Sequence, residues 1–164
     1  MTEHHTRLAH AFVTMVNERD ADAVDDLLVE DYIDHNVLIA PGREGNRAFW
    51  KEFFAAFPDV TAAAEDVIAS GDRVVGRYSY EGTHLGPFMG IEPTGRRISM
   101  HTIDIWRVEE GRFAEHWDEI NLYQLLQQLG VLPETGAETE TGAGTETGTG
   151  TEAGAGIRAE ATAA

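Results

Sequence analysis

Four segments in the middle of the chain alternate between apolar and polar residues, and this pattern constrains the fold more than any other feature. They cover residues 60–70, 73–83, 97–108 and 112–121. A period of two is typical of β-strands with one buried face. Gly71-Asp72 and Glu110-Gly111 separate the two pairs, where glycine permits tight hairpin turns. The sequence therefore predicts antiparallel strands.

Helical periodicity appears on either side of these strands. Apolar residues three or four apart predict a first helix over residues 3–18 and a third helix that ends at Pro58. Asp20 is placed to cap a short second helix, residues 32–36 follow as an extended segment, and a last short helix covers 122–129. Three N-terminal helices, strands and a C-terminal helix indicate the α+β class, with the helices packed on one face of the sheet.

A change of composition near Pro133 divides the chain into two parts. Residues 1–133 contain the aromatic and aliphatic residues of a folded domain, whereas residues 134–164 consist almost entirely of Glu, Thr, Gly and Ala. Such a segment buries too little apolar surface to offset the entropy lost on ordering. We expect one domain over 1–133 and a disordered acidic tail over 134–164.

The acidic charge narrows the range of partners. The chain carries 29 acidic against 12 basic residues, a formal net charge of −17, which repels nucleic acids and anionic membranes. It has no cysteine for disulfides, thiol catalysis or a cysteine zinc site. No apolar run is long enough to span a bilayer, and no signal peptide opens the chain. We expect a cytoplasmic protein without nucleic-acid or membrane partners.

The last two strands have one face of mixed polarity and one that offers much apolar surface. Mixed polarity is typical of a pocket lining. The residues of the mixed face are Met100, Thr102, Asp104, Trp106, Ala114, His116, Asp118 and Ile120. The apolar residues of the other face are Ile103, Ile105, Phe113 and Trp117. We interpret the mixed face as the inside and the other face as a contact with a second subunit, because a solvated face is normally more polar. Alternation alone leaves the reverse assignment open.

Several segments resemble the SnoaL-like polyketide cyclases, within the wider nuclear-transport-factor-2-like fold. The matching segments are 31–36, 82–86, 89–97, 108–118 and 125–130. The resemblance covers residues 5–133. It implies a cone-shaped, curved antiparallel sheet, an α+β barrel, around a deep pocket. It also implies a small-molecule substrate, such as a polyketide or another hydrophobic carbonyl compound, and a homodimer or homotetramer.

The resemblance further implies a catalytic aspartate at Asp118, which acts as acid and base in an intramolecular aldol ring closure without metal or cofactor. Two positions differ from the best-known cyclase. Asp104 stands where that enzyme has a histidine, and Asp34 stands where it has an asparagine. The site is therefore expected to be more acidic than the site of the best-known cyclase.

The residues themselves are consistent with proton transfer. Asp104 and Asp118 are predicted on one face of neighbouring strands, where burial and a second carboxylate raise a carboxyl pKa towards neutrality. The expected catalytic residues are Asp118, Asp104 and His116. Donors to an enolate and other substrate contacts are expected from Tyr32, Asp34, His35, Asn36, Trp50, Phe53, His84, Phe88 and Trp106.

No motif in the sequence calls for a metal or a cofactor, and none is expected. The seven histidines include no zinc-protease pair, and the chain lacks a phosphate loop, a dinucleotide fingerprint and a nucleophile elbow. Two alternatives to a cyclase remain open: a non-catalytic module that binds a metabolite, and an epoxide hydrolase on the same fold. The resemblance to such a hydrolase implies an Asp-Arg-Asp arrangement of catalytic residues. In this chain Thr102 occupies the arginine position.

Overall fold

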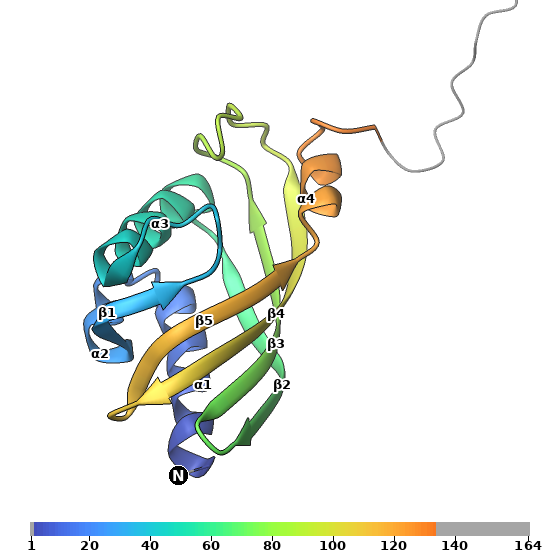
Figure 1. Cartoon of the computed structure of the whole chain (residues 1–164). Helices are drawn as coiled ribbons and strands as arrows, with labels where there is room; N and C mark the ends of the chain where they lie inside the picture. The colour runs from blue at the N-terminus through green and yellow to red at the C-terminus, as the bar shows by residue number, and fades with distance from the viewer. Residues whose placement is uncertain (1, 134–164) are drawn as a thin grey trace, which may run out of the picture.

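The computed structural model describes residues 2–133, so the expected acidic tail lies outside the described residues. A curved sheet wraps around the first helix, and the other helices lie along its open side and at one end (Figure 1). None of the helices in this part of the chain is long and apolar enough to cross a membrane.

The described residues form one five-stranded sheet in the order β1-β5-β4-β3-β2. Its strands are β1 Leu28–Asp34, β2 Thr61–Ser70, β3 Arg73–Thr83, β4 Arg97–Glu109 and β5 Arg112–Ile120. The four long strands pair antiparallel, as expected. The segment expected only to be extended belongs to β1, which pairs parallel with β5 and places Asp34 opposite His116. The sheet is therefore mixed rather than wholly antiparallel, and it stays unclosed between β1 and β2.

Both expected hairpin turns are confirmed, and each has a defined backbone geometry. Gly71 follows β2 with φ at 58°, which is typical of a two-residue turn with glycine at the first central position. Glu110 and Gly111 both have positive φ, at 50° and 79°. Such turns match the right-handed twist of the strands they join. His4 Nε2 lies 2.9 Å from the Gly111 carbonyl oxygen, which links the first helix to the second turn.

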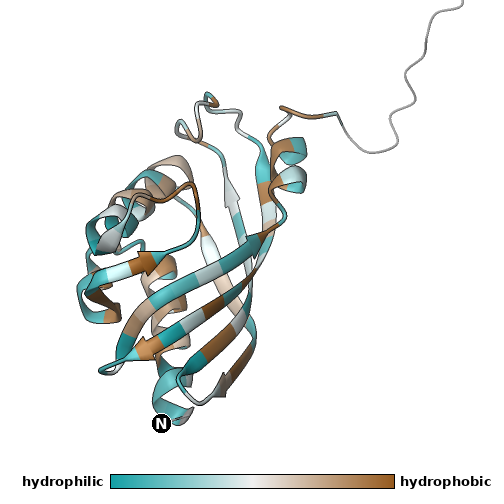
Figure 2. Ribbon diagram, in the orientation of Figure 1, coloured by the Kyte–Doolittle hydropathy of each residue, from teal (hydrophilic) through white to brown (hydrophobic). Residues whose placement is uncertain are grey.

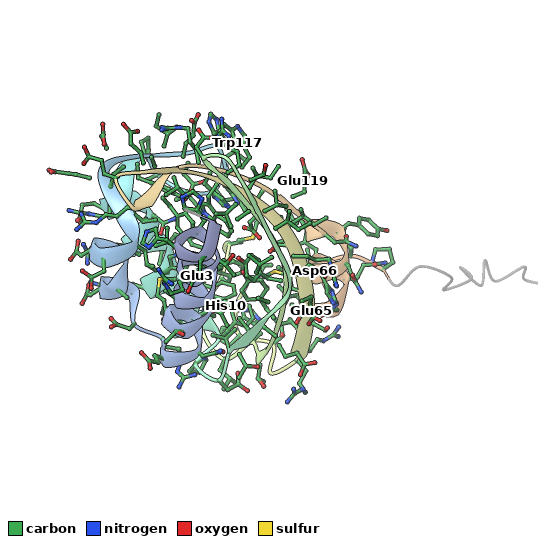
Figure 3. All side chains as sticks on the ribbon, turned by 90° about the horizontal axis from the view of Figure 1, so that it is seen from below. Glu3, His10, Glu65, Asp66, Trp117 and Glu119 are labelled. Carbon is green, nitrogen blue, oxygen red and sulfur yellow. The ribbon has the colours of Figure 1, made fainter. Side chains whose placement is uncertain are left out.

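The helices are α1 Thr2–Glu18, the 3-10 helix η1 Ala21–Ala23, α2 Val24–Leu27, α3 Gly42–Ala56 and α4 Leu122–Gln128. The expected cap is present, because the Asp20 carboxylate accepts a hydrogen bond from the Asp22 backbone N–H at 3.1 Å. Seen from below, α1 lies within the curve of the sheet, with Glu3 and His10 on it and Trp117 and Glu119 on β5 (Figure 3). The helices thus pack on the concave face, as predicted.

Burial along β4 settles which face of the sheet is inside. Hydrophobic and hydrophilic residues alternate along the strands (Figure 2). Met100, Thr102, Asp104 and Trp106 are buried, whereas Ile103 and Ile105 remain 51% and 39% exposed. The mixed face therefore lines the interior, and the apolar face is the outer surface of the sheet.

One residue of the last strand lies on the opposite face from the one expected. Phe113 was expected on the outside, but it is only 1% exposed and stacks on the Trp106 ring at 4.7 Å. The cause is a bulge: Phe113 pairs with Val108 and Glu115 with Arg107, which leaves Ala114 as an extra residue in β5. Alternation reverses across an extra residue, so residues on both sides of the bulge face inward.

Gly76 on β3 creates space for the buried Tyr78 ring. A Cβ atom at position 76 would lie 2.3 Å from three atoms of that side chain, which is fully buried. We expect Gly76→Val to lower the free energy of unfolding by about 3 kcal/mol, because the added side chain overlaps the buried Tyr78 ring and forces it to shift. Urea denaturation measures this, with the neighbouring, exposed Arg77→Val as control. Equal stabilities of the two variants would contradict the packing described.

Candidate active site

A cavity lies between the concave face of the sheet and the helices. Its volume is about 80 Å³, several times the roughly 10–15 Å³ that one water requires. Its apolar wall includes Phe12, Met15, Leu27, Phe49, Trp50, Phe53, Met100, Trp106 and Phe113. Its polar groups are Tyr32, Asn36, Asn46, Tyr80, Thr102, Asp104, His116 and Asp118. A mainly apolar wall with a few converging polar groups is typical of a site for a small organic molecule.

Loops from three parts of the chain contribute to the rim of the cavity. Leu38 comes from the β1–α3 loop, Met89 from the β3–β4 loop and Leu122 from the start of α4. The latter two elements stand side by side at one end of the sheet (Figure 1). Leu38 and Met89 are 47% and 43% exposed, so the cavity is bordered by apolar side chains that also reach solvent.

Asp118 is a half-buried carboxyl on the cavity wall. It lies directly opposite Asp104 in the antiparallel register of β4 and β5, as predicted. Burial raises the pKa of Asp118 above its ordinary 3.8, and the charge of Asp104 adds to the rise. The charge of His116 opposes this shift, as does the Asn36 side-chain amide, which donates to Asp118 Oδ2 at 2.8 Å. The result is a carboxyl that holds its proton more readily than an exposed aspartate.

His116 lies between two carboxylates. Its Nε2 is 3.0 Å from Asp104 Oδ1, and its Nδ1 is 3.2 Å from Asp34 Oδ1. Burial disfavours the charged ring, but the hydrogen bonds and charges of these two carboxylates raise the pKa of His116 to about 9. The ring is therefore an imidazolium at neutral pH, and both of its N–H groups are already used.

The two flanking carboxylates have further partners. The Asp34 side chain is completely buried, and its Oδ2 accepts a hydrogen bond from the Asn46 amide at 3.1 Å. The backbone N–H of Asn36 donates to Asp34 Oδ1 at 3.0 Å. The Thr102 hydroxyl donates to Asp104 Oδ2. Burial without these bonds would be costly, so the partners offset the desolvation of both carboxyl groups.

Aromatic rings fix the orientation of the imidazolium. His116 stacks on Trp106 at 5.1 Å with an interplanar angle of 17°, and Trp106 in turn stacks on Phe113. Stacking of a cation on an indole is attractive and restricts the tilt of the ring. The bulge that turns Phe113 inward therefore contributes to the geometry of the site.

The structure brings most of the expected site residues together. Those that line the cavity are Asp118, Asp104, His116, Tyr32, Asn36, Trp50, Phe53, Phe88 and Trp106. Asp34 lies behind the wall, against the far side of the His116 ring. Asp34 is thus one of three expected substrate contacts that do not line the cavity, and the other two are His35 and His84.

Both of these histidines have other surroundings. His35 follows the inward-facing Asp34, points away, stacks on Trp117 at 4.9 Å and contacts Glu115 at 3.0 Å. His84 is fully buried, and its Nδ1 lies 3.1 Å from the Thr94 hydroxyl. Its backbone N–H and carbonyl bond to the other end of the same loop, so it holds the β3–β4 loop in place.

Three polar lining residues were not among the expected contacts. Asn46 lies one helical turn before Trp50 on the buried face of α3, which is a spacing visible in the sequence. Tyr80 shares the inner face of β3 with Tyr78. Thr102 belongs to the face interpreted as the inside but was not among the expected contacts, and its hydroxyl donates to Asp104. Periodicity indicates that these side chains face inward. It does not indicate that their polar atoms line a cavity.

Comparison with known proteins decides the family. A model of the SnoaL-like polyketide cyclases matches residues 6–129. The chain belongs to this family. Among curated proteins, nogalonic acid methyl ester cyclase of Streptomyces nogalater is 28% identical over 124 residues, which covers 72% of this chain and 91% of that protein.

Solved structures of similar proteins agree with this family and with the nuclear-transport-factor-2-like cone fold. TsrD from Streptomyces laurentii has a TM-score of 0.75 at 35% identity and covers 79% of this chain and 97% of its own. AclR from Streptomyces galilaeus, a candidate hydroxylase, has a TM-score of 0.74 at 30% identity and covers 82% and 85%. The names of these similar proteins thus refer to different chemistry, a cyclase and a candidate hydroxylase.

Proposed function

We propose that this protein is a cofactor-independent cyclase that closes a ring in a small carbonyl compound by an intramolecular aldol reaction, with Asp118 as acid and base. The family supports a polyketide cyclase-type role. The observation that carries the proposal is the Asp118 carboxyl, half-buried on a mainly apolar cavity wall with its pKa raised. A carboxyl in such surroundings is suited to accept a proton and return it near neutral pH.

The proposed reaction needs one proton carrier. The Asp118 carboxylate removes a proton from a carbon that lies next to a carbonyl group. The resulting enolate carbon attacks a second carbonyl carbon of the same molecule and forms the new C–C bond. The alkoxide then takes the proton from the Asp118 carboxyl, which regenerates the carboxylate. The atoms are rearranged without loss or gain, so no oxidant is consumed.

We propose that two side chains, Asn36 and Tyr32, stabilise the enolate oxygen. The Asn36 amide has a second N–H besides the one it donates to Asp118, and Asn36 lines the cavity. Burial and the charge of Asp34 raise the pKa of Tyr32 well above its usual value, so its hydroxyl stays protonated and able to donate. Such donors act where negative charge develops. His116 does not serve here, because both of its N–H groups face carboxylates.

The charge of the cavity wall favours an uncharged substrate. Among the described lining residues the cationic one is His116, whose charge is shared between Asp34 and Asp104. We expect a polyketide ester to have a kcat/KM at least tenfold higher than the free acid, because a substrate carboxylate would face these carboxylates. Steady-state kinetics on a matched ester and acid measure this ratio. A preference for the acid would contradict the charge assignment.

The direct test of the proposed function is turnover without additives. The protein, treated with a chelator, is incubated with esters of linear and aromatic polyketides, and ring closure is followed by chromatography and mass spectrometry. We expect a cyclised isomer of unchanged mass, or the product of its dehydration. Ligands that bind tightly but are never converted would indicate the alternative, a non-catalytic binding module, and would reject the proposal.

We further propose that the outer face of the sheet joins two copies of the chain. Large apolar side chains are exposed there, with Ile33, Ile68, Ile103 and Ile105 between 39% and 65% exposed. The Arg73 guanidinium also lies 4.9 Å above the Trp117 ring on β5. An exposed apolar surface of this kind is typical of a protein interface.

A single charge on this face tests the proposed interface. We expect Ile103→Asp to weaken self-association at least 100-fold, because the carboxylate would be buried without a partner. Analytical ultracentrifugation measures this, with Ala11→Asp on the exposed side of α1 as control. If both variants sediment like the parent protein, copies of the chain do not associate through this face.

A further inference from the structure

A continuous series of hydrogen bonds connects β4 to the β1–α3 loop, whose residue Asn36 contacts Asp118 on β5. It begins at Asp104 on β4 and passes through the His116 ring to Asp34 at the end of β1. From Asp34 it continues to the backbone N–H of Asn36, whose side-chain amide donates to Asp118. The bonds measure 3.0, 3.2, 3.0 and 2.8 Å in this order. Asp118 is thus held by a loop residue that depends on Asp34.

The geometry requires a proton on both nitrogens of the ring. Each nitrogen faces a carboxylate oxygen, and an ionised carboxylate only accepts hydrogen bonds. A neutral imidazole would leave one nitrogen lone pair directed at a carboxylate. With the side chains of Asp34 and Asp104 0% and 6% exposed, water does not relieve that repulsion.

The surroundings of His116 contain no competing cation among the described residues. The groups that face this cluster are Asp34 and Tyr32 from β1, Asp104 from β4, Asp118 from β5 and the neutral Asn46 from α3. Tyr78 and Tyr80 on β3 face Asp104, whose charge, together with burial, raises their pKa values. One imidazolium therefore offsets several carboxylates that would otherwise repel one another.

We infer that His116 is a positioning residue: as an imidazolium shared by Asp34 and Asp104, it ties the β1–α3 loop to the sheet and holds the Asn36 amide against Asp118. The inference rests on the proposed function for the role of Asp118. The Asp34–His116–Asp104 clamp itself is a property of the folded protein. It assigns His116 no contact with the reacting atoms, because neither ring N–H is left for the substrate.

The same clamp explains how the loop is ordered. Asp34 Oδ1 accepts from the Asn36 backbone N–H, and the Asn36 side-chain oxygen accepts from the Leu38 N–H at 2.9 Å. Leu38 lies at the rim of the cavity. When the ring loses a proton, Asp34 loses its charged partner. We then expect the loop to loosen at both Asn36 and Leu38, so the catalytic carboxyl and the cavity rim lose their support together.

The first test needs no substrate. In protein labelled with ¹⁵N-histidine, we expect NMR at pH 7.5 to show both ring nitrogens of His116 protonated, with a titration midpoint near 9. His10, which is exposed on α1, is the internal comparison. A neutral ring with one protonated nitrogen at pH 7.5 would overturn the inference.

The second test follows the loop in variants. We expect Asp34→Asn and His116→Gln to speed hydrogen exchange at the Asn36 and Leu38 amides at least tenfold, while amides in the centre of β3 keep their rates. Because Asp34→Asn keeps the size of the side chain, it serves if His116→Gln does not fold. His10→Gln is the matched control. Unchanged exchange at both loop amides, or an equal rise throughout the sheet, would overturn the inference.

The third test separates positioning from mere stability. In folded Asp34→Asn protein we expect kcat to fall about 10- to 100-fold with KM nearly unchanged, because a displaced base costs rate rather than binding. The alkaline limb of the pH profile, near 9 in the parent protein, should move to lower pH. An unchanged kcat and pH profile would refute a positioning role. If Asp118→Asn remains fully active while the NMR and exchange results hold, the proposed function fails and the clamp stands.

Discussion

Asp118→Asn should lower kcat at least 1,000-fold on a confirmed substrate while leaving substrate binding nearly intact. The amide is isosteric with the carboxyl, so the cavity keeps its shape, but it cannot accept the proton from carbon. General acid–base catalysis contributes up to about 10⁴-fold, and here one residue provides both steps. Single-turnover kinetics, together with a ligand-binding isotherm for each protein, separate the rate of ring closure from affinity.

The control for this prediction is Asp26→Asn, since Asp26 is an exposed carboxyl on α2 outside the cavity. It should keep parental kcat and KM. Thermal unfolding should show that Asp118→Asn is at least as stable as the parent protein, because a half-buried charge is removed. A loss of activity accompanied by unfolding would not count for the proposed role, and full activity of folded Asp118→Asn would contradict it.

The free energy of unfolding should fall by about 3 kcal/mol as the pH rises from 6.5 to 10. The folded-state pKa of His116 is about 9, above the ordinary value of 6.5, so the folded state binds the extra proton between these values. Its stabilising contribution is complete below pH 6.5 and is lost as the pH passes through 9. The buried tyrosines Tyr32, Tyr78 and Tyr80, whose pKa values are raised above the ordinary 10, add a smaller loss as the pH approaches 10.

Urea denaturation at several pH values measures this linkage. The parent protein should lose stability steadily through pH 9, whereas His116→Gln should start lower and lose much less over the same range, with only the tyrosine contribution left near pH 10. His10→Gln should follow the parent protein, because His10 lies exposed on α1. A flat profile in the parent protein would mean that His116 is not held as an imidazolium in the folded state.

Local patterns in the sequence were sufficient to predict much of the fold. Gly71 and Gly111 indicated both hairpin turns, because turn geometry depends on neighbouring residues. Alternation placed Asp104, His116 and Asp118 on one face, and the mixed polarity of that face, not alternation itself, favoured it as the inner one. The family was also correctly recognised from segments in the second half of the chain.

Features that depend on distant contacts could not be predicted in this way. The bulge at Ala114 reverses the alternation in β5, and nothing in the sequence around Phe113 indicates an extra residue. Asp34 reaches His116 because β1 pairs parallel with β5 across 82 positions, and alternation within either strand does not specify that pairing. Alternation placed His116 and Asp104 on the same face, but it did not indicate that Asp34 supplies the second carboxylate of the clamp.

The two misplaced histidines have the same physical origin. His35 is one residue beyond an inward-facing strand position, so it points to the opposite side and stacks on Trp117. His84 lies just after β3, where its backbone bonds to Arg96 and Gly95 close the loop. Motif similarity placed both near the pocket, but side-chain direction depends on the strand ends that the structure defines.

Deuterium exchange from solvent into a substrate analogue that cannot cyclise tests the central claim most directly. The analogue keeps the carbon acid but lacks the second carbonyl, so proton removal is observed without bond formation. In D₂O we expect the parent protein and Asp26→Asn to introduce deuterium at that carbon, and Asp118→Asn to do so at least 1,000-fold more slowly. Equal rates of exchange with and without the Asp118 carboxyl would show that another group is the base.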